Sequence, residues 1–153
     1  MEKIPSFSKN HDELKRGLHE CGTAHGVTTW DLRFKTPNGG DYLDIAAMHT
    51  IEHLIATIVR NSAHKDDIIY FGPMGCRTGC YLLLAGDYDS VDIVPLITDM
   101  FAFIRDFRGE IPGAKAKDCG NYLDQNLAMA NYLADRYLKV LENITPDRLV
   151  YPV

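Results

Sequence analysis

The sequence lacks any long apolar run: its longest apolar stretches, "LIATIV" and "YLLLAG", are far too short to cross a membrane. The N-terminal segment "MEKIPSFSKNHDEL" also lacks the apolar middle of a signal peptide. Basic residues form no cluster, and the formal net charge is −5. We therefore expect a cytoplasmic protein that binds neither membranes nor nucleic acid.

Cysteine is scarce, and no two cysteines form a CxxC pair. In a cytoplasmic chain of 153 residues, this spacing argues against a disulfide framework. The thiols are then expected to be free, catalytic or bound to a metal. The cysteines are Cys21, Cys76, Cys80 and Cys119.

Secondary-structure patterns are mixed along the chain, which is long enough for one catalytic domain over residues 1–153. Alternating apolar residues predict strands, and apolar residues at helical spacing predict helices. Because strands and helices do not alternate regularly, we expect an α+β fold with a layered antiparallel sheet packed with helices. The strands are expected at 28–35, 67–74 and 80–87, and the helices at 44–61 (capped by Asp44), 90–109 (capped by Ser90) and 120–143.

The segment "HTIEH" suggests a metal site within the first expected helix. Residues four apart share one helix face, so His49 and His53 can bind one ion together. An isolated pair at this spacing arises often by chance on a polar helix face. The adjacent Glu52 and the apolar surroundings favour the metal site. This residue order also occurs in inverted-motif zinc peptidases, where the glutamate activates water and a distant segment supplies a third ligand.

The third ligand could be any remaining His, Cys, Asp or Glu. Cys119 is favoured because "KDCGNY" is expected to begin the last helix, and a helix N-terminus stabilises a thiolate. The alternative is a small buried cysteine with no chemical role.

The glycine-rich stretch "GPMGCRTGCY", residues 72–81, predicts a tight loop between two strands. Cys76 lies in this loop next to Arg77, whose positive charge is expected to lower the pKa of the thiol. Such a cysteine can act as a nucleophile or as a proton-transfer base. The alternative is a hairpin turn with an incidental cysteine. Cys80 is expected to be an ordinary strand residue.

The ordered motifs "HTIEHL", "GPMGCRTG" and "CGNY" resemble the S-ribosylhomocysteine lyase family, which makes the autoinducer-2 precursor. The resemblance extends over nearly the whole chain through "PSFSKNHDEL", "WDLRF" and "VRN". It implies that one divalent ion per subunit, iron(II) or alternatively zinc or cobalt, is held by His49, His53 and Cys119. It also implies acid/base roles for Glu52 and Cys76. Ser6, His11, Arg33 and Arg60 become expected substrate contacts.

The resemblance further implies a homodimer with its active site at the subunit interface. The reaction it implies converts S-ribosylhomocysteine to homocysteine and dihydroxypentanedione by carbonyl migration and β-elimination. Cys76 would move protons at carbon, and Glu52 would move them among the oxygens. One departure is Tyr70, which stands where many members of the family have an acidic residue. At this position the acidic substrate contact that the resemblance implies is missing.

Two other functions compete with the lyase. An inverted-motif metallopeptidase would use Glu52 to activate water, but it has no need of the loop around Cys76. A small non-enzymatic α+β module would leave the histidines at the surface and the cysteines in the core, and it would bind no metal.

Overall fold

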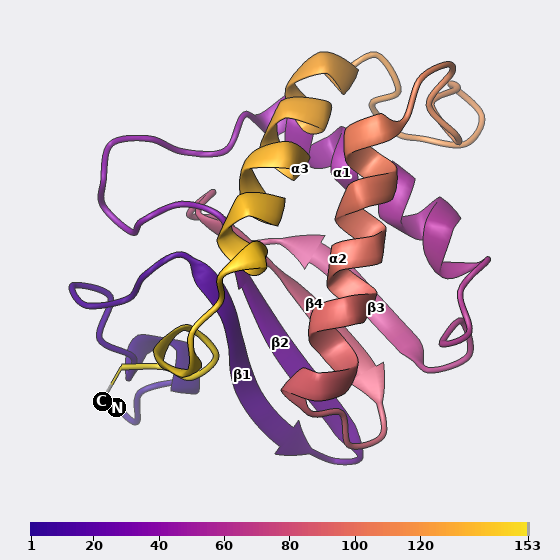
Figure 1. The fold of residues 1–153 in the computed structure, drawn as a ribbon. Helices are drawn as coiled ribbons and strands as arrows, with labels where there is room; N and C mark the ends of the chain where they lie inside the picture. The colour runs from indigo at the N-terminus through magenta and orange to yellow at the C-terminus, as the bar shows by residue number, and fades with distance from the viewer. Residues whose placement is uncertain (153) are drawn as a thin grey trace.

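A four-stranded antiparallel sheet supports three helices in the computed structural model, which describes residues 1–152 (Figure 1). The strands lie in the order β1-β2-β4-β3. This confirms the predicted α+β class and the antiparallel sheet. The strands are β1 (Gly17–Ala24), β2 (Val27–Arg33), β3 (Ile68–Pro73) and β4 (Gly79–Ala85), and the helices are α1 (Ile45–Val59), α2 (Ser90–Asp106) and α3 (Leu127–Glu142).

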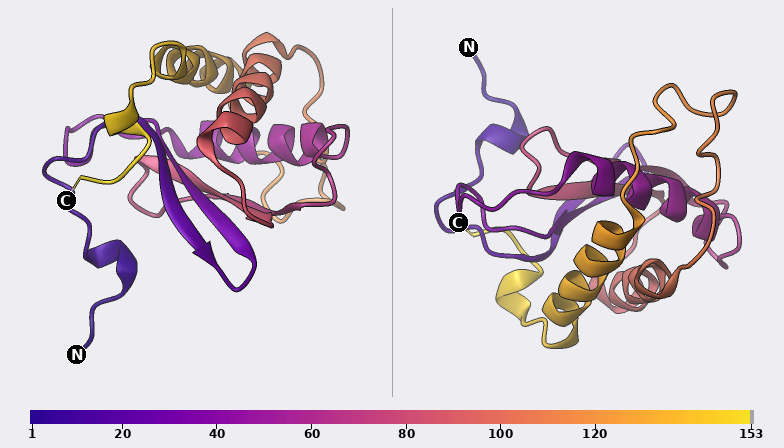
Figure 2. Two further views of the ribbon diagram at one scale, coloured as in Figure 1. Left: turned by 60° about the horizontal axis from the view of Figure 1, so that its bottom comes forward. Right: turned by 90° about the horizontal axis from the view of Figure 1, so that it is seen from above.

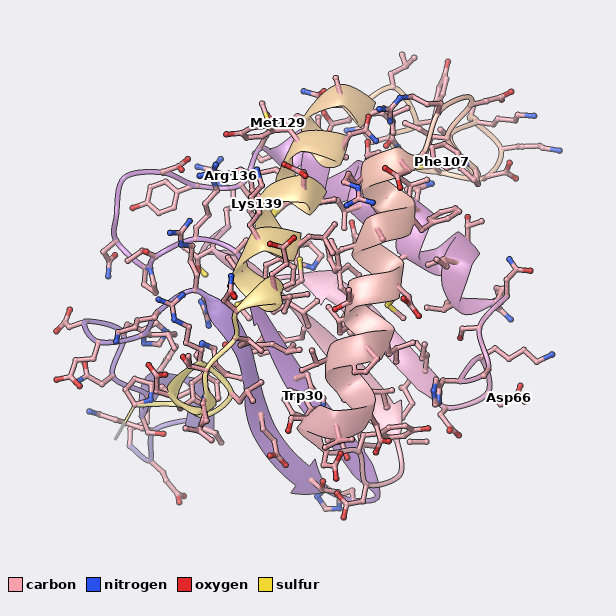
Figure 3. All side chains as sticks on the ribbon, viewed as in Figure 1. Trp30, Asp66, Phe107, Met129, Arg136 and Lys139 are labelled. Carbon is pink, nitrogen blue, oxygen red and sulfur yellow. The ribbon has the colours of Figure 1, made fainter. Side chains whose placement is uncertain are left out.

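The three helices cover one face of the sheet (Figures 1 and 2). Their apolar sides meet the inward-facing residues of β2 and β4 in one core. Trp30 of β2 is fully buried within it and lies between the sheet and the helical layer (Figure 3). The opposite face of the sheet is partly covered by the N-terminal segment, because Ile4 and Pro5 share a cavity wall with Tyr81 and Leu83 of the sheet.

Side-chain caps set where the helices begin. Asp44 accepts a hydrogen bond from the backbone N–H of Ala47, which confirms it as the cap of α1. The predicted cap of α2, Ser90, is wrong by one residue: Asp89 caps the helix through the N–H groups of Val91 and Asp92. Pro95 lies inside α2, so it does not displace the start of the helix.

The last helix begins seven residues later than expected, at Leu127 instead of Gly120. Asn126 caps it through the N–H of Met129. The preceding residues are instead held against α1: the Asp124 carbonyl bonds His49, and the Asn126 N–H donates to Thr50. Leu123, expected on the buried side of this helix, is 78% exposed.

Strand β1 was not predicted. Two glycines and a charged residue interrupt any apolar alternation in "GLHECGTA". The strand forms because it pairs with β2 from Gly17 to Ala24, with one irregularity at Cys21, and because the N–H of Glu20 donates to the carbonyl of Leu149. Among the described residues, no helix is both long and apolar enough to span a membrane.

Candidate active site

Helix α1 places the two histidines of the motif on one face, as its i,i+4 spacing predicts. The Nε2 atoms of His49 and His53 lie 3.1 Å apart, and both side chains are half-buried. The Sγ atom of Cys119 lies 3.4 Å from His49 Nε2. The ligand atoms of these three residues all lie within 4.8 Å of one another, so the residues form a cluster that could hold a metal ion.

Backbone carbonyls orient both imidazole rings. His49 Nδ1 lies 2.7 Å from the carbonyl oxygen of Asp124, and His53 Nδ1 lies 2.8 Å from that of Pro112. Because a carbonyl only accepts hydrogen bonds, each Nδ1 carries the hydrogen. In the neutral rings both Nε2 atoms then present lone pairs, and these face each other. A cation between them satisfies both lone pairs, which is the usual arrangement of metal-ligating histidines.

The spacing of the three ligands fits a tetrahedral ion. Bond lengths of about 2.0–2.1 Å to nitrogen and 2.3 Å to sulfur place two nitrogens about 3.3 Å apart and nitrogen and sulfur about 3.6 Å apart. The observed separations are 3.1 and 3.4 Å. Three protein ligands leave one position of such an ion open, as in catalytic metal sites.

Cys119 belongs to this cluster for a different reason from the one predicted. The expected helix N-terminus is wrong, because α3 begins only at Leu127. Cys119 instead lies in the loop between α2 and α3, where its backbone N–H donates to the carbonyl of Lys115. This loop passes beside α1 and brings the thiol to the histidines.

Glu52 lies beside the histidines in the wall of an open cavity of about 530 Å³. Partial burial raises the pKa of this carboxyl above its ordinary value, and the positive charge of His49 and His53 when protonated opposes the shift. Phe71, Pro112 and Asp118 also line the cavity. A carboxyl group adjacent to a metal cluster and an open cavity is suited to acid/base chemistry.

Cys76 lies in the predicted loop between β3 and β4, and its residue is exposed. It lines a second cavity, of about 380 Å³, together with His11. The Cys76 Sγ atom lies 3.1 Å from the Thr78 hydroxyl. The guanidinium of Arg77 donates to the Leu43 carbonyl at 3.4 Å, so the expected effect of its charge on Cys76 stays a prediction.

The metal cavity and the Cys76 cavity have no lining residue in common within residues 1–152. Within one chain, therefore, His49, His53, Cys119 and Glu52 come together, whereas Cys76 and His11 form a separate group.

Arg33 is buried, with 2% of its surface exposed, and forms an ion pair with Asp31. Its Nε and Nη2 atoms donate to the two carboxylate oxygens at 3.1 and 2.5 Å, and its Nη1 atom donates to Thr78 at 2.7 Å. Burial disfavours the charged guanidinium, but the Asp31 carboxylate outweighs that effect, and the pKa of Arg33 is raised. The structure thus places Arg33 behind the Cys76 loop.

Three further residues lie outside both cavities. Ser6 is half-buried in a short 3₁₀ turn, Pro5–Phe7, beside the outer face of the sheet. Arg60 is exposed at the C-terminal end of α1. Tyr70 is 53% exposed on β3, and its phenol lies over Gly72, where a Cβ atom would meet the ring.

Several groups of the site carried no signal in the sequence. The carbonyls of Pro112 and Asp124 orient the histidines through the backbone, which any residue type provides. Thr50 is buried and donates to Gln125, which ties α1 to the segment before α3. Its position one residue after His49 was the only available clue to a role near the site.

Known proteins match this chain over nearly its whole length. The model of the family "S-Ribosylhomocysteinase (LuxS)" matches residues 4–147. The S-ribosylhomocysteine lyase of Clostridium acetobutylicum is 52% identical and that of Clostridium beijerinckii 54% identical, in each case over 99% of both chains. The enzyme of the same name from Porphyromonas gingivalis is 51% identical, again over 99% of both chains. The chain belongs to the S-ribosylhomocysteinase family.

Proposed function

We propose that this chain catalyses the lyase reaction of its family at a centre where His49, His53 and Cys119 hold one divalent ion. The reaction cleaves S-ribosylhomocysteine to homocysteine and dihydroxypentanedione, a precursor of autoinducer-2. Residues 1–153 act as one catalytic domain, in the cytoplasm. The observation that carries the proposal is the convergence of the His49, His53 and Cys119 ligand atoms, with both histidines and Glu52 lining one open cavity.

The chemistry explains why these residue types are needed. The substrate's thioether has no neighbouring carbonyl, so the carbonyl of the opened sugar must migrate along the chain before homocysteine can leave by β-elimination. Each migration removes a proton from carbon and moves charge onto oxygen. A divalent ion supplies Lewis acidity, which stabilises the charge that develops on these oxygens. Two histidines and a thiolate suit iron(II), zinc and cobalt, and we assign iron(II) as the natural ion on the family resemblance.

Glu52 is the proposed proton shuttle among the substrate oxygens. Its carboxyl group lines the same open cavity as His49 and His53, where it can exchange protons with the oxygens of a bound substrate. Its place on α1, one residue before His53, keeps it next to the ligands. A peptidase would use the same carboxylate to activate water, but that reaction leaves the conspicuous Cys76 loop without a purpose.

Cys76 is the proposed base that removes protons from carbon and returns them. A thiolate is a good nucleophile and base at neutral pH, and the exposed side chain can reach a substrate. His11 shares its cavity and is a proposed substrate contact, together with Ser6, Arg33 and Arg60. The guanidinium of Arg33 is bonded to Asp31 and Thr78. We therefore propose that Arg33 affects the bound substrate through the Cys76 loop.

A complete site requires a second copy of the chain in this proposal. Since the metal cavity and the Cys76 cavity are separate within one chain, a homodimer unites them only if Cys76 of one subunit faces the metal ligands of the other. Large apolar side chains are available to form such an interface. They include Phe7, Ile45, Ile69, Tyr122 and Leu123, all more than one third exposed.

Hybrid dimers test this arrangement. The Cys76→Ala and His49→Ala variants are each expected to be inactive, and they are mixed under conditions that exchange subunits. Random exchange makes about half of the dimers hybrid, each with one intact site of two, so about one quarter of wild-type activity should return. No recovered activity in a mixture shown to contain hybrids would place the whole site within one chain.

A further inference from the structure

A buried chain of hydrogen bonds leads from the C-terminal segment to Cys76. The Tyr151 hydroxyl donates to Asp31 at 2.6 Å, and Asp31 accepts two hydrogen bonds from Arg33. Arg33 Nη1 donates to the Thr78 hydroxyl at 2.7 Å, and that hydroxyl lies 3.1 Å from Cys76 Sγ. The segments are far apart in the sequence, so no local motif reveals the connection.

The direction of the last hydrogen bond follows from the available hydrogens. A guanidinium only donates, so the Thr78 oxygen accepts from Arg33. The hydrogen of the Thr78 hydroxyl then needs an acceptor. Thr78 is 2% exposed, and within residues 1–152 its hydroxyl has one other polar partner, Cys76 Sγ. The hydroxyl hydrogen therefore points to the sulfur, and this arrangement favours the thiolate over the thiol.

The Tyr151 end of this hydrogen-bond chain fixes Arg33 in place. Asp31 is fully buried, and its carboxylate accepts hydrogen bonds from Arg33 and Tyr151. Burial and the adjacent Asp31 charge raise the pKa of Tyr151, so the phenol stays protonated and remains a donor. The Cys21 thiol lies 3.0 Å from the same phenol, and burial raises the pKa of that thiol. Each donor in this hydrogen-bond chain thus has an acceptor.

We propose that Thr78 and Tyr151 are positioning residues that hold Cys76 as a thiolate, Thr78 by donating to the sulfur and Tyr151 by fixing the Asp31–Arg33 pair. Thr78 keeps its own proton, and the proton lost by Cys76 goes to solvent. The inference rests on the proposed role of Cys76 and explains how that role is prepared before substrate binds.

Other charged or titratable groups also face Cys76. His11, Tyr42 and Arg77 line the same cavity. His11 Nδ1 lies 3.0 Å from the Lys9 carbonyl, and Arg77 donates to the Leu43 carbonyl. None of these residues has a hydrogen bond to the sulfur in the described structure, so Thr78 is the group that substitution should affect most directly.

The test measures the rate at which iodoacetamide alkylates Cys76 as a function of pH. Intact, metal-loaded protein is used, and the Cys76 peptide is quantified by mass spectrometry so that the other cysteines do not contribute. We expect Thr78→Val to move the pH midpoint of alkylation upward by about one to two units, the effect of losing one hydrogen bond to a charged group. Thr78→Ser keeps the hydroxyl and should restore the wild-type midpoint. Tyr151→Phe should give a smaller upward shift, and the exposed Tyr132→Phe none.

An unchanged midpoint in Thr78→Val overturns the inference, and so does a Thr78→Ser variant that behaves like Thr78→Val. If Thr78→Val fails to fold, Tyr151→Phe tests the inference instead. An unshifted alkylation midpoint in Tyr151→Phe would show that Tyr151 does not act on Cys76 through the Asp31–Arg33 pair. Alkylation does not depend on turnover. A shifted midpoint together with full lyase activity of Cys76→Ala would therefore reject the proposed role of Cys76 and leave the hydrogen-bond chain intact.

Discussion

Replacing Arg33 by methionine should destabilise the protein strongly. The Arg33 and Asp31 side chains are 3% and 0% exposed, so they form a buried ion pair. Methionine fills much of the same space but leaves the Asp31 carboxylate with a single hydrogen bond, from Tyr151. Breaking a buried pair from one side costs about 3–5 kcal/mol, because one charge stays buried without its partner.

This loss should be visible as a large shift in melting temperature. For a chain of this size, each kcal/mol lowers Tm by about 2–4 °C, so Arg33→Met should melt about 6–20 °C below wild type. The double variant Asp31→Leu/Arg33→Met removes both charges. It loses the hydrogen bonds to Tyr151 and Thr78, at about 1 kcal/mol each, and should therefore be more stable than Arg33→Met alone.

The assay is thermal and urea unfolding followed by circular dichroism at a fixed protein concentration, because a dimer's stability depends on concentration. Lys35→Met is the matched control: Lys35 pairs with Asp41 at 2.8 Å, but the Asp41 side chain is 76% exposed. This control should lose less than about 1 kcal/mol. If the free energy of unfolding fell no further in Arg33→Met than in Lys35→Met, the Arg33–Asp31 pair behind Cys76 would not behave as a buried ion pair, and the reasoning would be refuted.

Three further perturbations test other parts of the site. His49→Ala should abolish stoichiometric metal binding, measured by elemental analysis, whereas His25→Ala, in the turn between β1 and β2, should keep it; full occupancy in His49→Ala would remove this residue from the ligand set. Gly113→Ala should weaken metal binding about 10–100-fold, because Gly113 has a φ of +72° and a Cβ there would lie 3.2 Å from His53 Nδ1; unchanged affinity would show that this contact does not orient His53. The hydrogen bond to Asp67 raises the pKa of Tyr88 from 10.0 to about 12, so its small stabilising effect is complete below pH 10.0 and is lost as the pH rises through about 12. A phenolate absorbance titration should lose a transition near pH 12 in Tyr88→Phe, and an identical titration curve would contradict the raised pKa.

The parts of the site that the sequence predicted are local in the chain. Asp44 caps α1 and sets where the helix begins, and the i,i+4 rule then puts His49 and His53 together. Both steps use residues within ten positions of each other. The third ligand was harder. The family resemblance implied Cys119, but the helix start that favoured it on residue patterns does not exist. Cys119 reaches the cluster because a loop folds back beside α1.

The parts that could not be predicted depend on distant pairing or on backbone atoms. The cation expected beside Cys76 was its neighbour, Arg77. Arg77 has a φ of 59°, donates to the Leu43 carbonyl and lines the Cys76 cavity, so its expected effect on the thiol stays a prediction. A second cation, Arg33, stands opposite Gly79 across β2 and β4 and donates to Thr78 of the same loop. Sheet register of this kind follows from tertiary packing, which one sequence alone does not reveal.

Thiol release from S-ribosylhomocysteine tests the proposed lyase reaction directly and is measured with anaerobically prepared, metal-loaded protein, in parallel for wild type and Cys76→Ala. Metal content and melting temperature are recorded for both. We expect rapid release of homocysteine by wild type, and no release by Cys76→Ala at unchanged metal content. Normal release by Cys76→Ala would contradict the proton-transfer role of the loop thiol, and absence of release by metal-loaded wild type would contradict the proposed function itself.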